Sequence, residues 1–119
     1  CAKLISEELQ YIGTLCVEFF IDKEQNLYDN EIAPRVHNSG HLTINTYNIS
    51  QFENHIRAVC GLEKIQLEKI CNAKMINIIG DEINNYRNKK YTEKEFFFDY
   101  LKKEIKAKRK MGHITTLIK

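Results

Sequence analysis

Glu18 and Glu31 are the two acidic residues whose spacing first suggests chemistry. Each belongs to a β-branched and aromatic run, TLCVEFFI and LYDNEI, and the polar run DKEQN separates the two. This pattern predicts a β-hairpin. If residues 23–26 form its loop, Asp22 faces Leu27, and counting back places Glu18 opposite Glu31. Facing carboxylates repel each other, so the pair is either exposed and screened or holds a cation. Hard carboxylate oxygens suit Mg²⁺, and the register leaves both alternatives open.

The segment EIAPRVHNSGHL, which begins at Glu31, gathers polar groups without the periodicity of a helix or a strand. The hairpin register also places Asp29 on the face of Glu31, and Asn30 adds an amide beside the expected metal ligand. The planar guanidinium of Arg35 suits phosphate or carboxylate. Further donors follow on a stretch that Pro34 and Gly40 shape, namely His37, Asn38, Ser39 and His41. Such a loop either satisfies its own backbone in water or binds a ligand from a rigid scaffold.

Zinc is not expected at the His37/His41 pair. Ser39 and Gly40 disfavour a helix between the two histidines, and no third ligand follows at a typical spacing.

A third candidate site is the basic run between Tyr100 and Lys110, which holds six basic residues and one acidic residue. This composition is typical of a solvated basic face or of a phosphate clamp. Nucleic acid is not expected as a partner, because no aromatic residues interleave with the basic ones and the formal net charge is only +2.

The elements that must position these residues alternate between helix and strand. Residues 2–11 are expected to form a helix that Gly13 caps, and the hairpin follows it. Ser50 and Glu53 form a capping box that starts a second helix, which Gly61 ends. One apolar face of this helix carries Phe52, Ile56 and Val59.

The second half of the chain is less regular in pattern. Residues 75–80, MINIIG, predict a buried strand and a turn, whereas the polar residues 81–95 are expected at the surface. FFFDYL suits a strand or a helix, and residues 62–72 fit no single class.

The bulk composition is that of an ordinary globular domain, with 119 residues, 43% hydrophobic and 29% charged. No apolar run is long enough to span a membrane and no signal peptide opens the chain, so we expect a cytoplasmic protein. The four cysteines include no C-x-x-C pair and are expected to be buried free thiols. Because the chain begins with Cys1 rather than methionine, we expect a processed, cut or partial protein.

Together these motifs resemble one family. The segments VEFFIDKEQNLYDNEIAPRVHNSGHLT, ISQFENHIRAV, MINIIG and KRKMGHIT follow one another as in the C-terminal part of 5-(carboxyamino)imidazole ribonucleotide synthase, an ATP-grasp ligase of purine synthesis. The resemblance implies an α+β fold in which residues 1–61 form the C-terminal part of an ATP-grasp domain, with a helix and an antiparallel hairpin. Residues 62–119 would form a small β-rich C-terminal domain, with strand, loop and strand over 96–110.

The resemblance also implies an activity. In this family ATP, bicarbonate and 5-aminoimidazole ribonucleotide give the N-carboxylated ribonucleotide, ADP and phosphate, so the implied cofactors are ATP and Mg²⁺. By motif, Glu18 and Glu31 correspond to the Mg²⁺ ligands, and Asn30 with Glu31 to the nucleotide contacts. Arg35 corresponds to a catalytic position where the family handles carboxyphosphate, and His37 and Asn38 fall at the substrate.

Lys102 and Arg109 correspond to the lysine and arginine that hold the phosphate of the substrate. The family usually has Y-G-K and P-G-R-K at these two places, where this chain has YLK and AKRK.

Family members are much longer, and the region that precedes this part contains an N-terminal α/β domain and the lobe that clamps adenine. We therefore expect this chain to be inactive alone, to need that N-terminal part as a partner, and to expose apolar surface that leads to association or limited stability. Family members are often dimers, so the resemblance implies a homodimer as one form of that association. Two alternatives stay open: a catalytically dead structural or partner-binding module, and another purine-pathway ATP-grasp ligase such as the formate-dependent glycinamide ribonucleotide transformylase.

Overall fold

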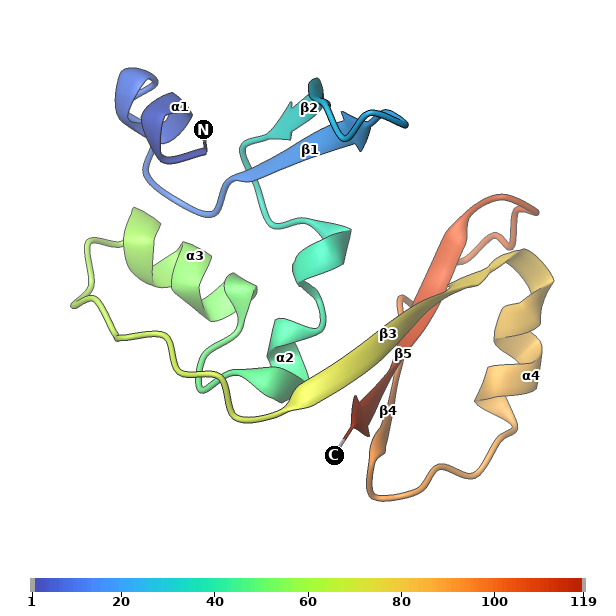
Figure 1. Cartoon of the computed structure of the whole chain (residues 1–119). Helices are drawn as coiled ribbons and strands as arrows, with labels where there is room; N and C mark the ends of the chain where they lie inside the picture. Colours follow the sequence, from blue (N-terminus) through green and yellow to red (C-terminus); the bar gives the residue numbers. More distant parts are fainter. Residues whose placement is uncertain (1, 119) are drawn as a thin grey trace. The chain divides into compact units, whose positions relative to one another are not determined.

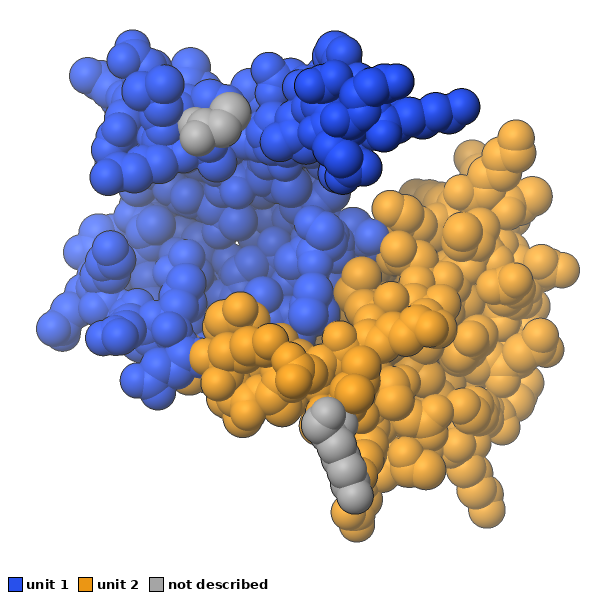
Figure 2. All heavy atoms as spheres, viewed as in Figure 1, with its two compact units in different colours: residues 1–44, 49–68 blue, residues 45–48, 69–119 orange. Residues whose placement is uncertain are grey.

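A computed structural model describes residues 2–118 of the chain. The chain forms two compact units, coloured separately in Figure 2. Unit 1 comprises residues 1–44 and 49–68, and unit 2 comprises residues 45–48 and 69–119. Helices combine with antiparallel sheets in Figure 1, which confirms the expected α+β class. The expected domain boundary near residue 61 stays a prediction.

Unit 1 combines helices with one two-stranded sheet. Its elements are α1 (Ala2–Glu8), β1 (Cys16–Ile21), β2 (Leu27–Ala33), the 3₁₀ turn η1 (Asn38–Gly40) and α3 (Gln51–Val59), while the short α2 (Thr43–Thr46) straddles the ranges of the two units.

The first helix is shorter than predicted, because α1 ends at Glu8 rather than near residue 11. Gln10 adopts a φ of 50° and terminates the helix in place of Gly13. The amide of Gln10 donates to the carbonyl of Glu7 at 3.1 Å, and the amide of Tyr11 donates to that of Ser6 at 3.0 Å. These two bonds form a Schellman motif, which satisfies the last carbonyls of the helix.

The predicted hairpin is confirmed, and Glu18 pairs with Glu31 as expected. Near the turn the prediction is wrong, because Ile21 rather than Asp22 faces Leu27. Asp22 belongs to the turn, where its carboxylate accepts hydrogen bonds from the backbone and side-chain amides of Asn26 at 2.8 and 3.0 Å.

A β-bulge between Glu18 and Phe19 restores the predicted register at the glutamates. Asn30 is the extra residue on β2, since Glu18 pairs with Glu31 while Phe19 pairs with Asp29. Asp29 therefore lies on the face of Phe19, and its expected place on the face of Glu31 is wrong.

Ser50 is confirmed as the N-cap of α3 and Gly61 as its end, whereas the Glu53 carboxylate accepts from Arg57 Nε at 2.9 Å. Ser50 accepts a hydrogen bond from the amide of Glu53, and Gly61 adopts a φ of 63° just after the helix. The apolar face of α3 does not form a core in unit 1. Phe52, Ile56 and Val59 are exposed, which agrees with the expectation that the chain exposes apolar surface.

Unit 2 is built on a three-stranded antiparallel sheet in the order β3-β5-β4. Its strands are β3 (Asn72–Ile79), β4 (Glu95–Asp99) and β5 (Lys110–Ile118), and η2 (Gly80–Glu82) and α4 (Ile83–Arg87) connect β3 to β4 (Figure 1). Residues 96–110 therefore form strand, loop and the start of a strand, as the resemblance implied. Ile78, Met111 and Ile114 form the core with Ile83.

Residues 81–95 are only partly the surface excursion that their polarity predicts. Ile83, at the start of α4, is fully buried in the core of unit 2. One apolar residue in a polar run therefore anchors this segment to the sheet.

The cysteines are less buried than predicted. Cys16 and Cys71 are free and half-buried, whereas Cys60 is free and exposed at the C-terminal end of α3, and Cys1 lies outside the described residues. Among residues 2–118 no helix has the length and apolar character that crossing a membrane requires.

Candidate active site

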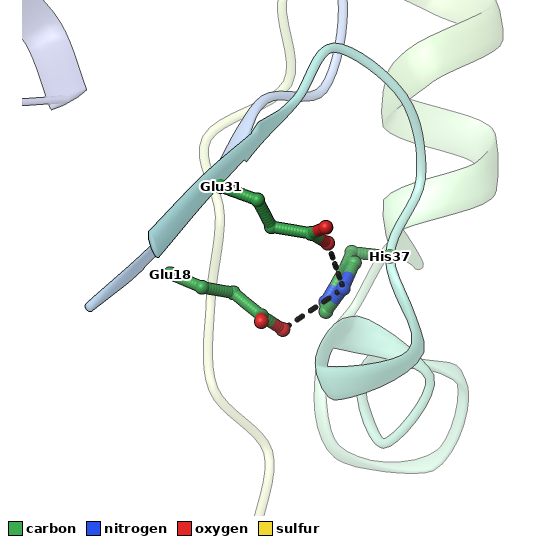
Figure 3. Close-up of side chains that lie close together, drawn as sticks. All are labelled: Glu18, Glu31 and His37. Atoms are coloured by element: carbon green, nitrogen blue, oxygen red, sulfur yellow. Dashed lines mark ion pairs between the residues drawn. The ribbon is translucent and has the colours of Figure 1, made fainter. Parts of the chain in front are cut away.

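Three side chains of unit 1 converge in the group that Figure 3 shows: Glu18 from β1, Glu31 from β2 and His37 from the loop after β2. The His37 Nε2 atom lies 3.1 Å from Glu18 Oε1 and 3.9 Å from Glu31 Oε1. The His37 side chain is 13% exposed, whereas those of Glu18 and Glu31 are 40% and 53% exposed. The imidazole is thus the most buried of the three side chains, and the two carboxylates are more exposed to solvent.

Asn30 joins this group because of the β-bulge. Its side-chain amide donates to Glu18 Oε2 at 3.3 Å. In a regular ladder, Asn30 and Glu31 would point to opposite faces of the sheet, whereas a bulge re-aims the extra side chain. The bulge therefore assembles an amide and two carboxylates from two strands.

The protonation pattern of His37 follows from its hydrogen bonds. Its Nδ1 atom accepts from the backbone amide of Ser39, and this bond caps η1. A ring nitrogen that accepts carries no proton, so the Nε2 atom of His37 carries it and donates toward Glu18. His37 therefore presents a donor to the two carboxylates rather than a lone pair.

The donor set fits Mg²⁺ held by carboxylates. The candidate ligand atoms of Glu18, Glu31 and His37 lie within 4.8 Å of one another. Two ligands on one Mg²⁺ ion are at most about 4.2 Å apart, since each bond is about 2.1 Å long. Small side-chain shifts suffice for the two carboxylates, whereas the protonated Nε2 of His37 suits a neighbouring anion better than the metal.

Arg35 and Asn38 lie on the same loop. The guanidinium of Arg35 donates to the carbonyl of Val36 at 3.1 Å, and the residue is exposed. Asn38 starts η1 and is half-buried. Neither residue belongs to the carboxylate–histidine group of Figure 3.

Sequence analysis missed Gln51, whose side chain contacts the loop at His37 and at His41. The signal was present in the capping motif SQFE, but a capping box assigns roles only to its serine and its glutamate. His41 does not belong to the carboxylate–histidine group of Glu18, Glu31 and His37.

Unit 2 holds the second candidate site, on the loop between β4 and β5. Lys102 Nζ donates to the carbonyl of Lys110 at 2.7 Å and lies 5.3 Å from the centre of the Tyr100 ring. Burial, and then the positive charge of Arg109, lower the pKa of Lys102. Two expected phosphate ligands therefore interact electrostatically in this unit, and a bound anion would relieve their repulsion.

Leu101 departs from the family motif at a position where the backbone has a positive φ. The Y-G-K motif of the resembling family usually places glycine here, and Leu101 adopts a φ of 51°, in the left-handed region that favours glycine. The residue is 80% exposed, so little packing holds the Leu101 side chain in place.

Comparisons with known proteins give one consistent result. The ATP-grasp domain profile matches residues 1–52, and the profile of the phosphoribosylaminoimidazole carboxylase C-terminal domain matches residues 73–119. The N5-carboxyaminoimidazole ribonucleotide synthase of Bacillus subtilis is 45% identical over 112 residues, which cover 93% of this chain and 30% of that protein.

Solved structures agree with the sequence matches. The N5-carboxyaminoimidazole synthetase of Staphylococcus aureus complexed with ADP has a TM-score of 0.86 and 42% identity over 98% of this chain and 32% of its own. The Aspergillus clavatus synthase, in complex with ADP and 5-aminoimidazole ribonucleotide, has a TM-score of 0.77 and 34% identity over 89% of this chain and 30% of its own. The chain therefore belongs to the N5-carboxyaminoimidazole ribonucleotide synthase family of ATP-grasp proteins and spans about 30% of the length of the relatives it matches.

Proposed function

We propose that this chain supplies the Mg²⁺ site and the substrate-phosphate site of an ATP-grasp carbon–nitrogen ligase. The reaction would carboxylate 5-aminoimidazole ribonucleotide with ATP and bicarbonate in purine biosynthesis. The observation that carries the proposal is the pairing of Glu18 with Glu31 beside Asn30 and His37. Family membership supports the substrates, since the Aspergillus clavatus relative binds ADP and 5-aminoimidazole ribonucleotide.

In this proposal the residues of unit 1 handle the phosphates of the nucleotide. Mg²⁺ held by Glu18 and Glu31 would neutralise phosphate charge, which phosphoryl transfer requires. Asn30 would place its amide at the nucleotide beside Glu31. His37 would turn its Nε2 proton to an anionic oxygen of the substrate, with Asn38 beside it.

Arg35 would act in catalysis on the activated bicarbonate. Its guanidinium offers parallel donors that match the planar oxygens of a carboxylate or phosphate group. Its exposure and its single contact with Val36 leave the side chain able to turn to such a group.

In unit 2, Lys102 and Arg109 would bind the ribonucleotide phosphate. Burial and then the charge of Arg109 lower the pKa of Lys102, and a phosphate dianion would compensate the second of these causes. The activity would also require the remaining length of the family fold, and this chain alone would be inactive. Homodimer formation and a cytoplasmic location stay predictions.

The test is phosphate release from Mg·ATP in the presence of bicarbonate and aminoimidazole ribonucleotide. The chain would be assayed alone and mixed with a polypeptide that supplies the rest of the family fold. We expect activity only in the mixture, and its loss in Glu31→Gln. Activity on glycinamide ribonucleotide instead would indicate another purine-pathway ligase. Inactivity of a mixture that forms a stable complex would indicate a module without catalysis.

A further inference from the structure

Gln51, at the first position of α3, is a buried residue that is 9% exposed. Its amide makes three hydrogen bonds to the loop of residues 37–41. The Oε1 atom accepts from the backbone amide of His37 at 2.9 Å. The Nε2 atom lies 2.7 Å from the carbonyl oxygen of His37 and 2.8 Å from His41 Nδ1.

The backbone of His37 fixes the orientation of this amide. The backbone N–H of His37 requires an acceptor and its carbonyl requires a donor. If the Gln51 amide were flipped, its NH₂ group would face the N–H and its oxygen would face the carbonyl, and both hydrogen bonds would be lost. The two hydrogens of Gln51 Nε2 therefore go to the His37 carbonyl and to His41. Since an amide nitrogen only donates, His41 Nδ1 accepts and the His41 ring carries its proton on Nε2.

The Gln51 amide occupies the space beside Gly40. A Cβ atom at Gly40 would lie 2.4 Å from Gln51 Oε1, so the absence of a side chain there admits the amide. Thr43 Oγ1 donates to the Gly40 carbonyl at 2.6 Å and accepts from the backbone amide of Gln51 at 2.9 Å. The side chain of Gln51 is thus bonded to the loop directly, and its backbone amide is linked to the loop through Thr43.

From this geometry we infer that Gln51 is the positioning residue that holds His37 against Glu18 and Glu31. Gln51 bonds to both polar backbone groups of His37, and the ring of His37 is bonded to Ser39 at one nitrogen and to Glu18 at the other. With the backbone held on both sides, Nε2 of His37 stays 3.1 Å from Glu18. The inference rests on the proposed metal site for its functional meaning.

The test uses the 119-residue chain, labelled with ¹⁵N at histidine, and the variant Gln51→Glu. This substitution keeps the shape and one acceptor but replaces both N–H donors with an acceptor. Long-range ¹H–¹⁵N spectra report which ring nitrogen carries the proton. We expect a proton on Nε2 alone for His41 in the unmodified chain, and a proton on Nδ1 in Gln51→Glu. Gln10→Glu, an exposed position in unit 1, is the control and should leave the spectrum unchanged.

The second readout is the affinity for Mn²⁺, measured by paramagnetic broadening. We expect Gln51→Glu to lose about tenfold in affinity, as the loss of a group that orients a metal site commonly does, while Gln10→Glu loses none. A His41 ring protonated on Nδ1 in the unmodified chain would overturn the inference. So would a folded Gln51→Glu that keeps both the tautomer and the affinity for Mn²⁺.

Two further variants keep the outcomes separable. Gly40→Ala should displace the Gln51 amide and reproduce the loss of affinity for Mn²⁺, which covers the case in which Gln51→Glu does not fold. Glu18→Gln tests the metal site itself. If Glu18→Gln leaves Mn²⁺ binding unchanged, the proposed metal site fails, and the histidine spectra still decide the role of Gln51.

Discussion

Glu18 and Glu31 face each other across the β1–β2 ladder because Asn30 bulges out of β2. Two carboxylates in facing positions repel in the absence of a cation. We therefore expect Glu31→Gln to keep or slightly raise the unfolding midpoint of the metal-free chain. The same substitution should lower the affinity for Mn²⁺ about tenfold or more, because it removes a charged ligand.

Glu24→Gln is the matched control for this prediction, since it makes the same charge change in the exposed turn of the same hairpin. Isothermal titration with Mn²⁺ and a thermal melt would give both quantities. Equal affinities in Glu31→Gln and Glu24→Gln would contradict a metal site at the carboxylate pair.

Removing the charge of Arg109 should change how Lys102 titrates. Burial is the first cause of the lowered pKa of Lys102 and the charge of Arg109 is the second. In Arg109→Gln we expect this pKa to rise but to stay below its usual range, because burial remains. NMR titration of the Lys102 side chain measures the change, and Lys103→Gln on the same loop should have a smaller effect.

The binding of inorganic phosphate to this loop should weaken as the pH rises. The sign follows from the lowered pKa, because Lys102 loses its positive charge at a lower pH than an ordinary lysine and an anion binds the charged form. Phosphate affinity that does not change through the Lys102 titration would show that Lys102 does not contribute.

Leu101→Gly should be tolerated although it removes a large side chain. A left-handed conformation costs an L-residue roughly 1–2 kcal/mol, while glycine loses about 0.5–1 kcal/mol more conformational entropy on folding. Leu101 has a φ of 51° and is 80% exposed, so its replacement by glycine relieves backbone strain and removes little packing. We expect a free energy of unfolding that is unchanged or up to about 1 kcal/mol higher, measured by denaturant titration.

Lys103→Gly is the control for the leucine, since Lys103 is exposed on the same loop and has no positive φ. It should destabilise unit 2 by about 0.5–1 kcal/mol. Equal losses in both glycine variants would show that the conformation of Leu101 stores no strain.

The link between Asp99 and Arg87 should make unit 2 sensitive to acid. Asp99 accepts from Arg87 Nε at 2.7 Å and from the amide of Leu101 at 2.8 Å. The hydrogen bond from Arg87 is the main cause that lowers the pKa of Asp99 from 3.8. Because the folded-state pKa is lowered, the stabilisation is present above the unfolded pKa and is lost as the pH falls through the folded pKa.

Asp99→Asn should therefore lower the free energy of unfolding at pH 7 by about 1 kcal/mol, and by less as the pH falls below about 4. Asp81→Asn, at an exposed position of η2, is the control. A constant difference between Asp99→Asn and the unmodified chain from pH 7 to pH 3 would contradict the role of the ion pair.

The hairpin shows what sequence could and could not predict. Alternating patterns and a polar turn located both strands, and counting placed Glu18 opposite Glu31. The count succeeded although it assumed a shorter loop and no bulge, because the extra loop residue and the extra strand residue offset each other. Neither the side-chain bonds of Asp22 in the turn nor the bulge at Asn30 has a periodic signature.

Burial was harder to predict than secondary structure. The apolar face of α3 was visible in the spacing of Phe52, Ile56 and Val59, but periodicity does not say what lies against a face. Ile83 shows the converse, since a single apolar residue in a polar run gives no period and yet is fully buried. The role of Gln51 depends on three bonds to a distant loop, which no local pattern encodes.

Gly40 and Gly61 look alike in the sequence, yet they should differ in the substitutions that natural variation or a mutant library allows. Gly61 has a φ of 63° and open space around its missing side chain, so asparagine, which tolerates that conformation, is an acceptable replacement. Gly40 has no such backbone requirement, but its side-chain position is occupied by the Gln51 amide. Position 61 should therefore accept only residues that tolerate a positive φ. Position 40 should accept a side chain only if residue 51 is replaced at the same time.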